Sequence, residues 1–540
     1  MERSKLRDSD MNINSSETDT PLYNQIPLLG RLLITFVVMT GTFMAILDTT
    51  IVDVVVPKMM APLKTDLYGV QWVITAYMMA AATSLLIIES LDKILGLKKI
   101  FLIGIIVFTL SSVLCGFAED LPQMIVARVI QGMGEAFIVA SAQTIMFSIF
   151  PPEKKGIAMG IYGMGVSFAP ALGPTLGGWL TEHMNWRSIF FVNLPVGLMV
   201  IVLGFILIPK FKTENVRFKF NFISYTLLAS FTISLLVMLS KGQQKGWFQS
   251  DLILILTLIS IGSLILYLIS EIVSKTPLID FNIFKIKQYR YSMLIYFFTL
   301  GLSIYQLFYI IPLYYENLRH YTTLQTGLHM LAFAIFIGVT SPISGILSDK
   351  IGEKNVLVFN AFLYITTSVF LIPNLNYYTP SVRAMLLTVP LGFSLGSFFA
   401  PITTLAMRNL REKTSLGVGL MHYIRFMGGS FGTAIATNTL QSRFNCHYEE
   451  ISTMQNNTHV YHYIKNVGDY LTKIFPPQIA EIKAGALIAK AQSTMALSHS
   501  FQDVFRHAGY FGIFGLSFLI AIFWTERKNE KINRIKPDSS

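Results

Sequence analysis

Charged residues and cysteines are scarce in this chain of 540 residues. Asp, Glu, Lys and Arg make up 14% of the sequence, whereas a soluble domain carries about 25%. The two cysteines, Cys115 and Cys446, are too few for a disulfide framework and fit no metal-ligand spacing. The chain also lacks the phosphate-binding loop G-x-x-x-x-G-K-[ST] of an ATP-driven pump and any Ser–His or metal constellation of a membrane enzyme. We therefore expect no enzymatic activity, no metal and no cofactor.

Hydrophobic residues dominate the composition instead. They form 53% of the chain, and the mean hydropathy is +0.55. An apolar run of about 20 residues can cross a bilayer as one helix. The sequence contains fourteen such runs and predicts an all-α polytopic membrane protein with 14 transmembrane helices. The expected spans are 31–56, 70–90, 100–117, 123–147, 157–179, 189–208, 222–240, 251–270, 291–315, 325–347, 356–372, 382–404, 416–438 and 508–525.

The basic residues predict how these spans are oriented. Fourteen spans put both termini on one side, where the loops hold 18 Lys and Arg against 6 in the short opposite loops. Because cytoplasmic loops carry the excess of Lys and Arg, we expect both termini in the cytoplasm. The net charge of +11 comes from these short clusters and does not indicate a nucleic-acid partner. Residues 1–25 are polar and predict a tail; the apolar run that follows is too long for a signal peptide, so we expect it to be retained.

Residues 439–506 form the only long connection and are expected outside the membrane, opposite the termini. They contain Pro476 and Pro477 and an Ala-rich stretch, 481–499, that favours a helix. Two interpretations stay open. The segment is either a surface elaboration or a docking surface for a partner outside the membrane.

An internal repeat divides the chain. The loop at 91–99 (LDKILGLKK) matches the one at 345–354 (GILSDKIGEK) when Gly96 is aligned with Gly352. Duplicated halves are typical of secondary transporters, whose substrate site lies between the halves. The spans then divide into two six-helix bundles with two extra helices between them.

Several motifs occur in order along the spans. Residues 345–352 read Gly-x-Leu-x-Asp-x-x-Gly, whereas the first copy carries Glu89 and Lys93 in place of its Gly and Asp. The other motifs are LDTTIVDVVVP at 47–57, with Asp53 in place of an Asn, RVIQG at 128–132, APALGPTLGG at 169–178, NWRSIFFVNLP at 185–195 and RFMGGSFG at 425–432.

With these motifs the chain resembles the major facilitator superfamily, and within it the 14-helix drug:proton antiporters of the EmrB/QacA type, over roughly residues 30–525. The resemblance implies a cytoplasmic tail at 1–30, an N-terminal bundle at 31–208, linker helices at 209–290, a C-terminal bundle at 291–525 and a second tail at 526–540. It implies proton-driven export of hydrophobic or amphipathic toxic compounds by alternating access. Export of one endogenous metabolite, such as a siderophore, is the alternative.

Ionisable groups inside the apolar spans are expensive and usually functional. Asp48 is the favoured proton carrier, since burial favours its protonated form and a nearby cation its ionised form. Arg128 is the expected cation, and a permanent Asp48–Arg128 pair that clamps two helices is the competing interpretation. Glu135 lies seven residues after Arg128 on nearly the same helix face. It is a second titratable group, an attraction for cationic substrates or a polar residue without a transport role.

A stripe of small residues runs along the fifth span. Gly165, Ala169, Gly173 and Gly177 recur every four residues, and small residues let helices approach closely. Pro170 and Pro174 are expected to bend the helix. In the family this helix packs against its counterpart from the other half, so we expect the stripe to take part in gating. The predicted gating residues are Gly165, Pro170, Gly173, Pro174, Gly177, Gly178, Gly345, Asp349 and Gly352.

Polar and aromatic residues of the spans predict a cavity for bulky apolar compounds. The residues chosen are Trp72, Tyr77, Gln131, Tyr305, Tyr309, His422 and Arg425. The expected partners are the substrate, protons and lipid, with a periplasmic adaptor of the EmrA type and an outer-membrane channel as a further possibility. The expected location is the bacterial cytoplasmic (inner) membrane.

Overall fold

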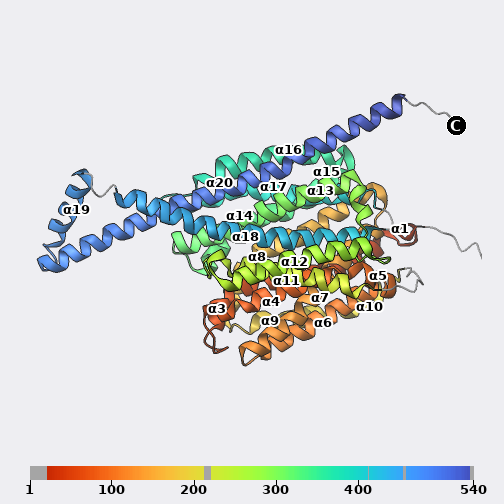
Figure 1. The fold of residues 1–540 in the computed structure, drawn as a ribbon, viewed down its shortest axis with the longest axis horizontal. Helices are drawn as coiled ribbons and strands as arrows, with labels where there is room; N and C mark the ends of the chain where they lie inside the picture. Colours follow the sequence, from red (N-terminus) through yellow and green to blue (C-terminus); the bar gives the residue numbers. More distant parts are fainter. Residues whose placement is uncertain (1–20, 212–219, 411–412, 454–457, 536–540) are drawn as a thin grey trace, which may run out of the picture.

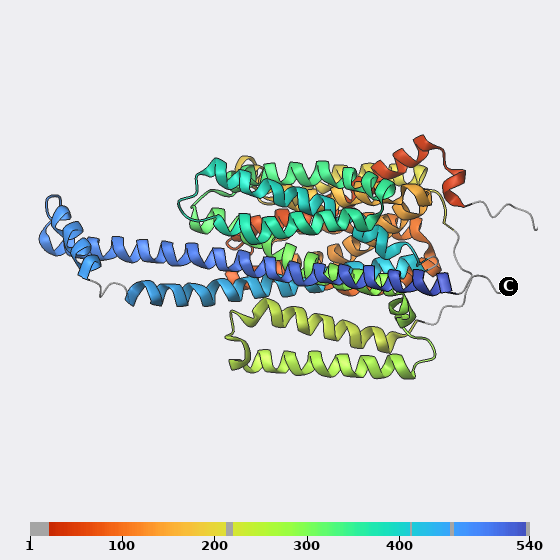
Figure 2. The ribbon, with the colours of Figure 1, turned by 90° about the horizontal axis from the view of Figure 1, so that it is seen from above.

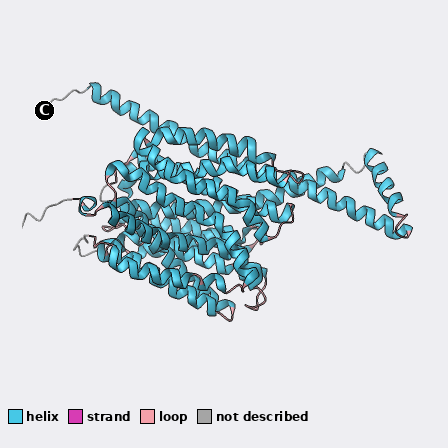
Figure 3. Ribbon diagram, turned by 180° about the vertical axis from the view of Figure 1, so that it is seen from behind, coloured by secondary structure: helices cyan, strands magenta, loops and turns pink. Residues whose placement is uncertain are grey.

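The computed structural model of the protein describes residues 21–211, 220–410, 413–453 and 458–535. In these residues all regular elements are helices (Figures 1 and 3). Of the two predicted tails, residues 1–20 and 536–540 lie outside them, whereas 526–535 continue the last helix. We call α2–α10 the first half of the protein. The short helix α1 (Leu22–Gln25) precedes it. The helices of the first half are α2 (Leu28–Met59), α3 (Leu67–Val70), α4 (Trp72–Leu85), α5 (Ile88–Leu95), α6 (Leu97–Phe117), α7 (Leu121–Ile149), α8 (Lys155–His183), α9 (Ser188–Phe191) and α10 (Asn193–Leu207).

Two helices follow, and then the helices that we call the second half, α13–α20. Short π-helical segments interrupt the spans that contain α13, α14 and α16, at Tyr296–Ile304, Tyr314–Leu318 and Thr366–Leu371. The remaining helices are α11 (Phe222–Gly242), α12 (Asp251–Val273), α13 (Lys287–Ile295), α14 (Tyr305–Leu313), α15 (Thr323–Ile351), α16 (Glu353–Ile365), α17 (Ser381–Met407), α18 (Thr414–Thr453), α19 (Thr458–Leu471) and α20 (Pro477–Ile535).

Local signals explain where the long helices begin and end. The Asp120 carboxylate accepts a hydrogen bond from the Gln123 backbone N–H at 2.9 Å and caps α7. Thr322 and Gln325 form a reciprocal capping box at the start of α15, which satisfies two of the free N–H groups of its first turn. Gly352 follows the last residue of α15 with a φ of +89°, a conformation that favours glycine. The glycine of the repeated motif therefore ends this helix.

Eleven helices of the described chain are long and apolar enough to cross a membrane, and two bent pairs raise this number to thirteen. The predicted number of fourteen is not reached by this criterion. The span expected at 416–438 is the missing one. It lies in α18, whose mean hydropathy is lowered by His422, Arg425 and several glycines. One of the bent pairs is α8, which bends by 44° between Pro170 and Leu172, next to the two prolines that the sequence identified.

The spans run side by side in one bundle. The short helix α1 and the C-terminal end of α20 lie at the same end of it, and α19 lies beyond the opposite end (Figure 1). This arrangement agrees with the expectation that the two termini share one side and that segment 439–506 lies on the other. Which end faces the cytoplasm remains a prediction from the charges.

The two extra helices, α11 and α12, form a pair on one side of the bundle (Figure 2). α11 packs against α4 of the first half and α18 of the second. The Thr75 and Ser240 hydroxyls lie 3.2 Å apart, and those of Thr232 and Tyr423 lie 2.7 Å apart. In the most apolar window of α12, only 17% of the residues are buried. The pair is therefore held through α11, and α12 presents an apolar outer surface that suits lipid.

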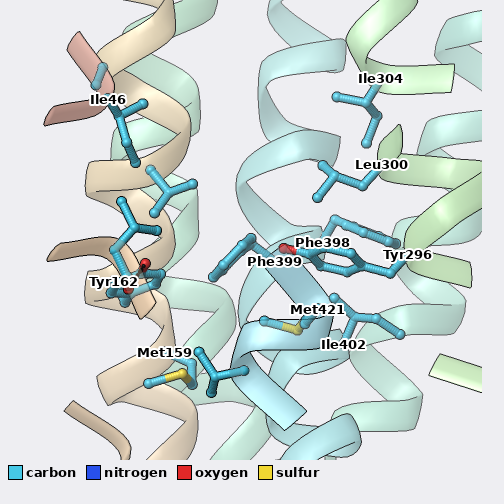
Figure 4. Packing of buried hydrophobic residues seen from close by; sticks show 14 of the residues in the cluster. Ile46, Met159, Tyr162, Tyr296, Leu300, Ile304, Phe398, Phe399, Ile402 and Met421 are labelled. Carbon is cyan, nitrogen blue, oxygen red and sulfur yellow. Dashed lines mark hydrogen bonds between the residues drawn. The ribbon is translucent and has the colours of Figure 1, made fainter. Parts of the chain in front are cut away.

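The two halves share a single hydrophobic core. The ring of Phe399, from α17, lies between the rings of Tyr162 and Tyr296, at centroid distances of 5.8 Å and 6.3 Å (Figure 4). Tyr162 belongs to α8, in the first half, and Tyr296 to the second half. Aromatic packing around Phe399 thus joins the two halves.

The predicted long loop is a helical hairpin. α18 and α20 run together past the end of the bundle and are joined through α19 (Figures 1 and 2). The Asp503 carboxylate of α20 accepts hydrogen bonds from Arg443 at 2.8 Å and Arg506 at 3.2 Å, and lies 2.9 Å from His447. The predicted Ala-rich helix is continuous with α20. The hairpin therefore has an ordered, charge-stabilised base.

Candidate functional site

Asp48 and Arg128 form a buried ion pair. Arg128 Nη1 donates to Asp48 Oδ2 at 2.6 Å, and both side chains are almost completely shielded from solvent. Gln131 Nε2 and Asn193 Nδ2 donate to Asp48 Oδ1 at 3.1 Å and 2.7 Å. Both carboxylate oxygens are therefore satisfied, and the negative charge is well compensated.

Arg128 is held equally firmly. Its Nε donates to the carbonyl oxygen of Val73 at 3.2 Å, its Nη1 donates to Gln131 Oε1 at 2.7 Å, and its Cζ lies 3.9 Å from the centroid of the Tyr77 ring. The expectation that Asp48 meets Arg128 is thus fulfilled geometrically. Gln131 and Tyr77, chosen as cavity residues, instead complete this pair.

Asn193 is a member of this cluster that sequence reasoning missed. Its Nδ2 also donates to Ser112 Oγ at 2.9 Å, and Ser112 donates to the Phe190 carbonyl oxygen at 2.9 Å. The signal was present, since Asn193 is a polar residue within the apolar part of the motif at 185–195. Its distance from Asp48 along the chain concealed the contact. The side chain of Asp53 lies outside the described residues.

Glu135 is buried on the same helix as Arg128, with 3% of its surface exposed. Its Oε2 has no hydrogen-bond partner in the described part of the chain. Arg425 of α18 and Arg128 both interact electrostatically with this carboxylate. Glu135 therefore faces a cation of the second half, and its charge is less completely compensated than that of Asp48.

His422 and Arg425 lie one turn apart on α18 and are both buried. The Tyr162 hydroxyl is 3.4 Å from His422 Nε2, whereas His422 Nδ1 and Arg425 Nε have no hydrogen-bond partner within the described residues. We call Glu135, Tyr162, Tyr296, His422 and Arg425 the central polar cluster. It joins α7 and α8 of the first half to α18 and the π-helical segment of the second.

The other predicted cavity residues lie elsewhere. Trp72 faces Lys241 of α11, whose Nζ is 5.7 Å from the ring centroid. Tyr309 is 38% exposed, and its hydroxyl lies 3.4 Å from Thr437 Oγ1. Tyr305 is partly buried and interacts electrostatically with Arg425. A separate cavity of about 330 Å³ lies near Phe147, Lys155 and Arg408, and none of the predicted cavity residues lines it. The expected residues thus do not line one common pocket.

The intact repeat motif connects the two halves at the end of the bundle nearest α1. Asp349 Oδ1 and Oδ2 accept hydrogen bonds from the backbone N–H groups of Gly156 at 2.7 Å and Ile157 at 2.9 Å. These donors belong to the first turn of α8, where a carboxylate also meets the favourable helix dipole. Gly345, one turn before Asp349, lies directly against Gly156. The motif therefore ties α15 to the start of α8.

The small-residue stripe packs against a different helix from the expected one. A Cβ atom added to Gly165, Gly173 or Gly177 would meet Met39, Thr50 or Ile51, all on α2. The stripe thus packs against α2, inside the first half. A second set of glycines lies on another face of α8. Gly156, Gly160 and Gly178 contact α15, and so does Gly163, through Ser341. The expected packing of the helix against the other half is present, but the stripe does not form it.

The degraded first copy of the motif forms its own ion pair. Lys93 Nζ lies 2.8 Å from Glu89 Oε1, one helical turn away on α5. The two residues that depart from the motif thus interact with each other. The two halves consequently differ, because Asp349 has no carboxylate counterpart at Lys93.

Comparison with known proteins decides the family. Residues 38–433 match the family model of the Major Facilitator Superfamily. The chain belongs to this superfamily. The assignment confirms the resemblance seen in the motifs, and it makes this multi-pass membrane protein a transporter rather than an enzyme.

Relatives within the superfamily match most of the chain. The chain is 29% identical over 426 residues to the multidrug export protein EmrB of Haemophilus influenzae, covering 78% of this chain and 82% of that protein. It is 29% identical over 507 residues to YhcA, an uncharacterised MFS-type transporter of Bacillus subtilis, covering 93% and 94%. The solved structure of the human organic anion transporter MFSD10 matches with a TM-score of 0.57 at 12% identity, covering 91% of this chain and 99% of that one. The last match supports the fold alone.

Proposed function

We propose that this superfamily member exports small hydrophobic or amphipathic toxic compounds in exchange for protons. The observation that carries the proposal is the central polar cluster, which buries a carboxylate of the first half, Glu135, with a guanidinium of the second, Arg425. Buried ionisable groups at the junction of two moving bundles suit ion coupling. Similarity to proteins named as multidrug exporters supports drug efflux over uptake.

The surroundings of the cluster favour an apolar substrate. Tyr162, Phe399 and Tyr296 contribute aromatic faces beside the polar groups. Sites for bulky organic molecules are mostly apolar, with a few polar groups that orient the ligand. Separation of the halves would expose these rings together with Glu135 and Arg425. Such a surface fits amphipathic compounds.

We place the protein in the bacterial cytoplasmic membrane with both termini in the cytoplasm, from the 18 to 6 distribution of Lys and Arg. The hairpin of α18, α19 and α20 then projects outward. A periplasmic adaptor of the EmrA type, connected to an outer-membrane channel, is the partner that we propose for this hairpin in a host with two membranes.

A growth screen tests the function directly. A drug-sensitive bacterial strain expressing the protein is exposed to lipophilic cations, detergents, uncharged antibiotics and iron chelators. The control strain expresses Asp48→Asn at a matched level, because we expect loss of this ion pair to inactivate the protein whether the pair has a coupling or a structural role. The proposal predicts protection against several unrelated amphipathic compounds. Protection against chelators alone would favour a dedicated siderophore exporter, and equal growth of both strains would contradict export of these classes.

A further inference from the structure

The ion pair of Asp48 is contained within one half of the protein. Its partners Arg128, Gln131 and Asn193 belong to α7 and α10, and Asp48 belongs to α2. Alternating access moves one half against the other largely as rigid bodies. Such a movement leaves these distances unchanged. Asp48 therefore keeps its compensating cation in both states of the cycle, which makes it a poor group for exchanging a proton.

Glu135 is placed differently. It is buried, its Oε2 lacks a hydrogen-bond partner in the described residues, and Arg425, a cation that interacts with it, belongs to the other half. Arg425 Nε likewise has no partner there, and the pair is not closed into a salt bridge within 4 Å. A rigid-body movement of the halves therefore changes the charge that faces Glu135.

The other groups that face Glu135 come from four helices. Tyr77 of α4 and Tyr162 of α8 are neutral when protonated, Arg128 lies on α7 itself, and Asp48 lies on α2. The charges of Arg128 and Asp48 offset each other in their ion pair. Of the charged groups described around Glu135, only Arg425 lies in the other half. The net charge that surrounds Glu135 thus depends on how the two halves are arranged.

We propose that Glu135, rather than Asp48, carries the transported proton, and that Arg425 is the positioning residue that controls its release. This assignment rests on the proposed proton-coupled export. When the halves bring Arg425 toward Glu135, the guanidinium stabilises the carboxylate and the proton leaves its oxygen for water. When the halves separate the two groups, a buried carboxylate without a counter-ion is costly, and Glu135 takes up a proton from the side to which the site has opened. Asp48 and Arg128 act as the clamp of the first half.

A chemical label tests the assignment without any substrate. Dicyclohexylcarbodiimide is an apolar reagent that reacts with protonated carboxyl groups. The carboxyl O–H adds across one C=N bond, and the adduct rearranges to a stable N-acylurea, so the peptide gains the whole mass of the reagent and nothing leaves. The purified wild-type protein is labelled across pH and its peptides are mapped by mass spectrometry. We expect label on Glu135 that decreases as pH rises, and none on Asp48. Label on Asp48, or its absence from Glu135, would overturn the proposal.

Variants test the part played by Arg425. Arg425→Ala should extend the labelling of Glu135 to higher pH, because the stabilising charge is lost, and Arg425→Lys should move the profile back toward wild type. Arg443→Ala is the matched control, since it removes a guanidinium of the same helix that pairs with Asp503 in the hairpin, and it should leave the pH profile in place. An unchanged profile in Arg425→Ala would show that Arg425 does not control the protonation of Glu135.

Transport of tetraphenylphosphonium in proteoliposomes separates this inference from the proposed function. Glu135→Gln should lose proton-driven efflux of this cation but retain its exchange across the membrane without a gradient, which also reports intact folding. Asp48→Asn should impair both activities together by loosening the clamp. Proton-driven efflux that persists in Glu135→Gln would refute the assignment. Failure of the wild type to move the probe in either mode would count against the proposed function for this class of compound, and the labelling result would still decide which carboxylate binds the proton.

Discussion

Gly156 of α8 and Gly345 of α15 touch through their backbones, so closely that a Cβ atom on either would overlap the carbonyl oxygen of the other. Asp349, one turn further along α15, accepts hydrogen bonds from the first turn of α8 beside this contact. The contact joins the two halves at the end of the bundle where α1 lies. In the structure this end is closed between α8 and α15, and any movement that opens it must first separate these two glycines.

Gly345→Val should therefore favour the conformation in which α8 and α15 separate at this end of the bundle. Forcing extra atoms into a packed contact typically costs about 1–3 kcal/mol, enough to shift a conformational balance without preventing folding. The readout is maleimide labelling of Met159→Cys, since Met159 is fully buried on α8. The label should react faster in the Gly345→Val background. Gly262→Val is the control, because a Cβ atom at Gly262 meets nothing within 4 Å; equal labelling rates in the two backgrounds would exclude this contact as a gate.

The stripe on α8 should affect folding more than gating. Gly173 packs against Thr50 of α2 within the first half. Gly173→Ala and Thr50→Gly should each lower the unfolding temperature in detergent, the first by a clash and the second by about 0.3 kcal/mol of lost helix propensity. The double variant, which moves the glycine to the other helix, should recover part of the loss from Gly173→Ala. Strictly additive effects would show that the two positions do not interact.

Much of the fold could be predicted from the sequence because membrane spans are local patterns of composition. The predicted spans all fall on helical segments, although those at 70–90, 189–208, 291–315 and 356–372 are interrupted. The bend of α8 follows from Pro170 and Pro174. The span at 416–438, which contains His422 and Arg425, was also predicted, although it fails the hydropathy criterion that the other spans meet. Its polar residues lower its mean hydropathy, so hydropathy alone does not identify it as a membrane span.

The site was less predictable because it depends on contacts between distant segments. The Asp48–Arg128 pair was expected, but Asn193 and its role could not be inferred from spacing. Glycines on two faces of α8 left open which face meets α2 and which meets α15. Whether Glu135 faces the second half likewise depends on helix packing that periodicity does not specify.

The orientation can be tested with single cysteines at exposed positions at the two ends. Lys350→Cys near the end of α15 and Lys465→Cys on α19 are exposed. In intact cells, a membrane-impermeant maleimide should label Lys465→Cys only, and disruption of the cells should make Lys350→Cys reactive as well. The reverse pattern would invert the proposed topology.

We predict that the projecting hairpin of α18, α19 and α20 binds a partner protein in hosts with two membranes. Replacing residues 454–476 by a short Gly-Ser turn removes α19 and leaves the base around Asp503, Arg443 and His447 in place. This variant should exchange tetraphenylphosphonium normally in proteoliposomes but confer less resistance than wild type in such a host expressing an EmrA-type adaptor. Asp503→Asn, which keeps the hairpin length, is the matched comparison. Equal resistance with and without the tip would make the hairpin a surface elaboration.

Proton-driven export is the central claim, and proteoliposomes with an imposed pH gradient test it most directly. Protein is inserted in one known orientation, and tetraphenylphosphonium movement is followed with a proton gradient directed opposite to the expected export, and then with the gradient collapsed by an ionophore that exchanges K⁺ for H⁺. The account predicts uphill movement of the cation only while the gradient is present, together with proton movement in the opposite direction. Uphill movement that survives collapse of the gradient, or a gradient that drives no movement of a cation that the protein exchanges, would contradict it.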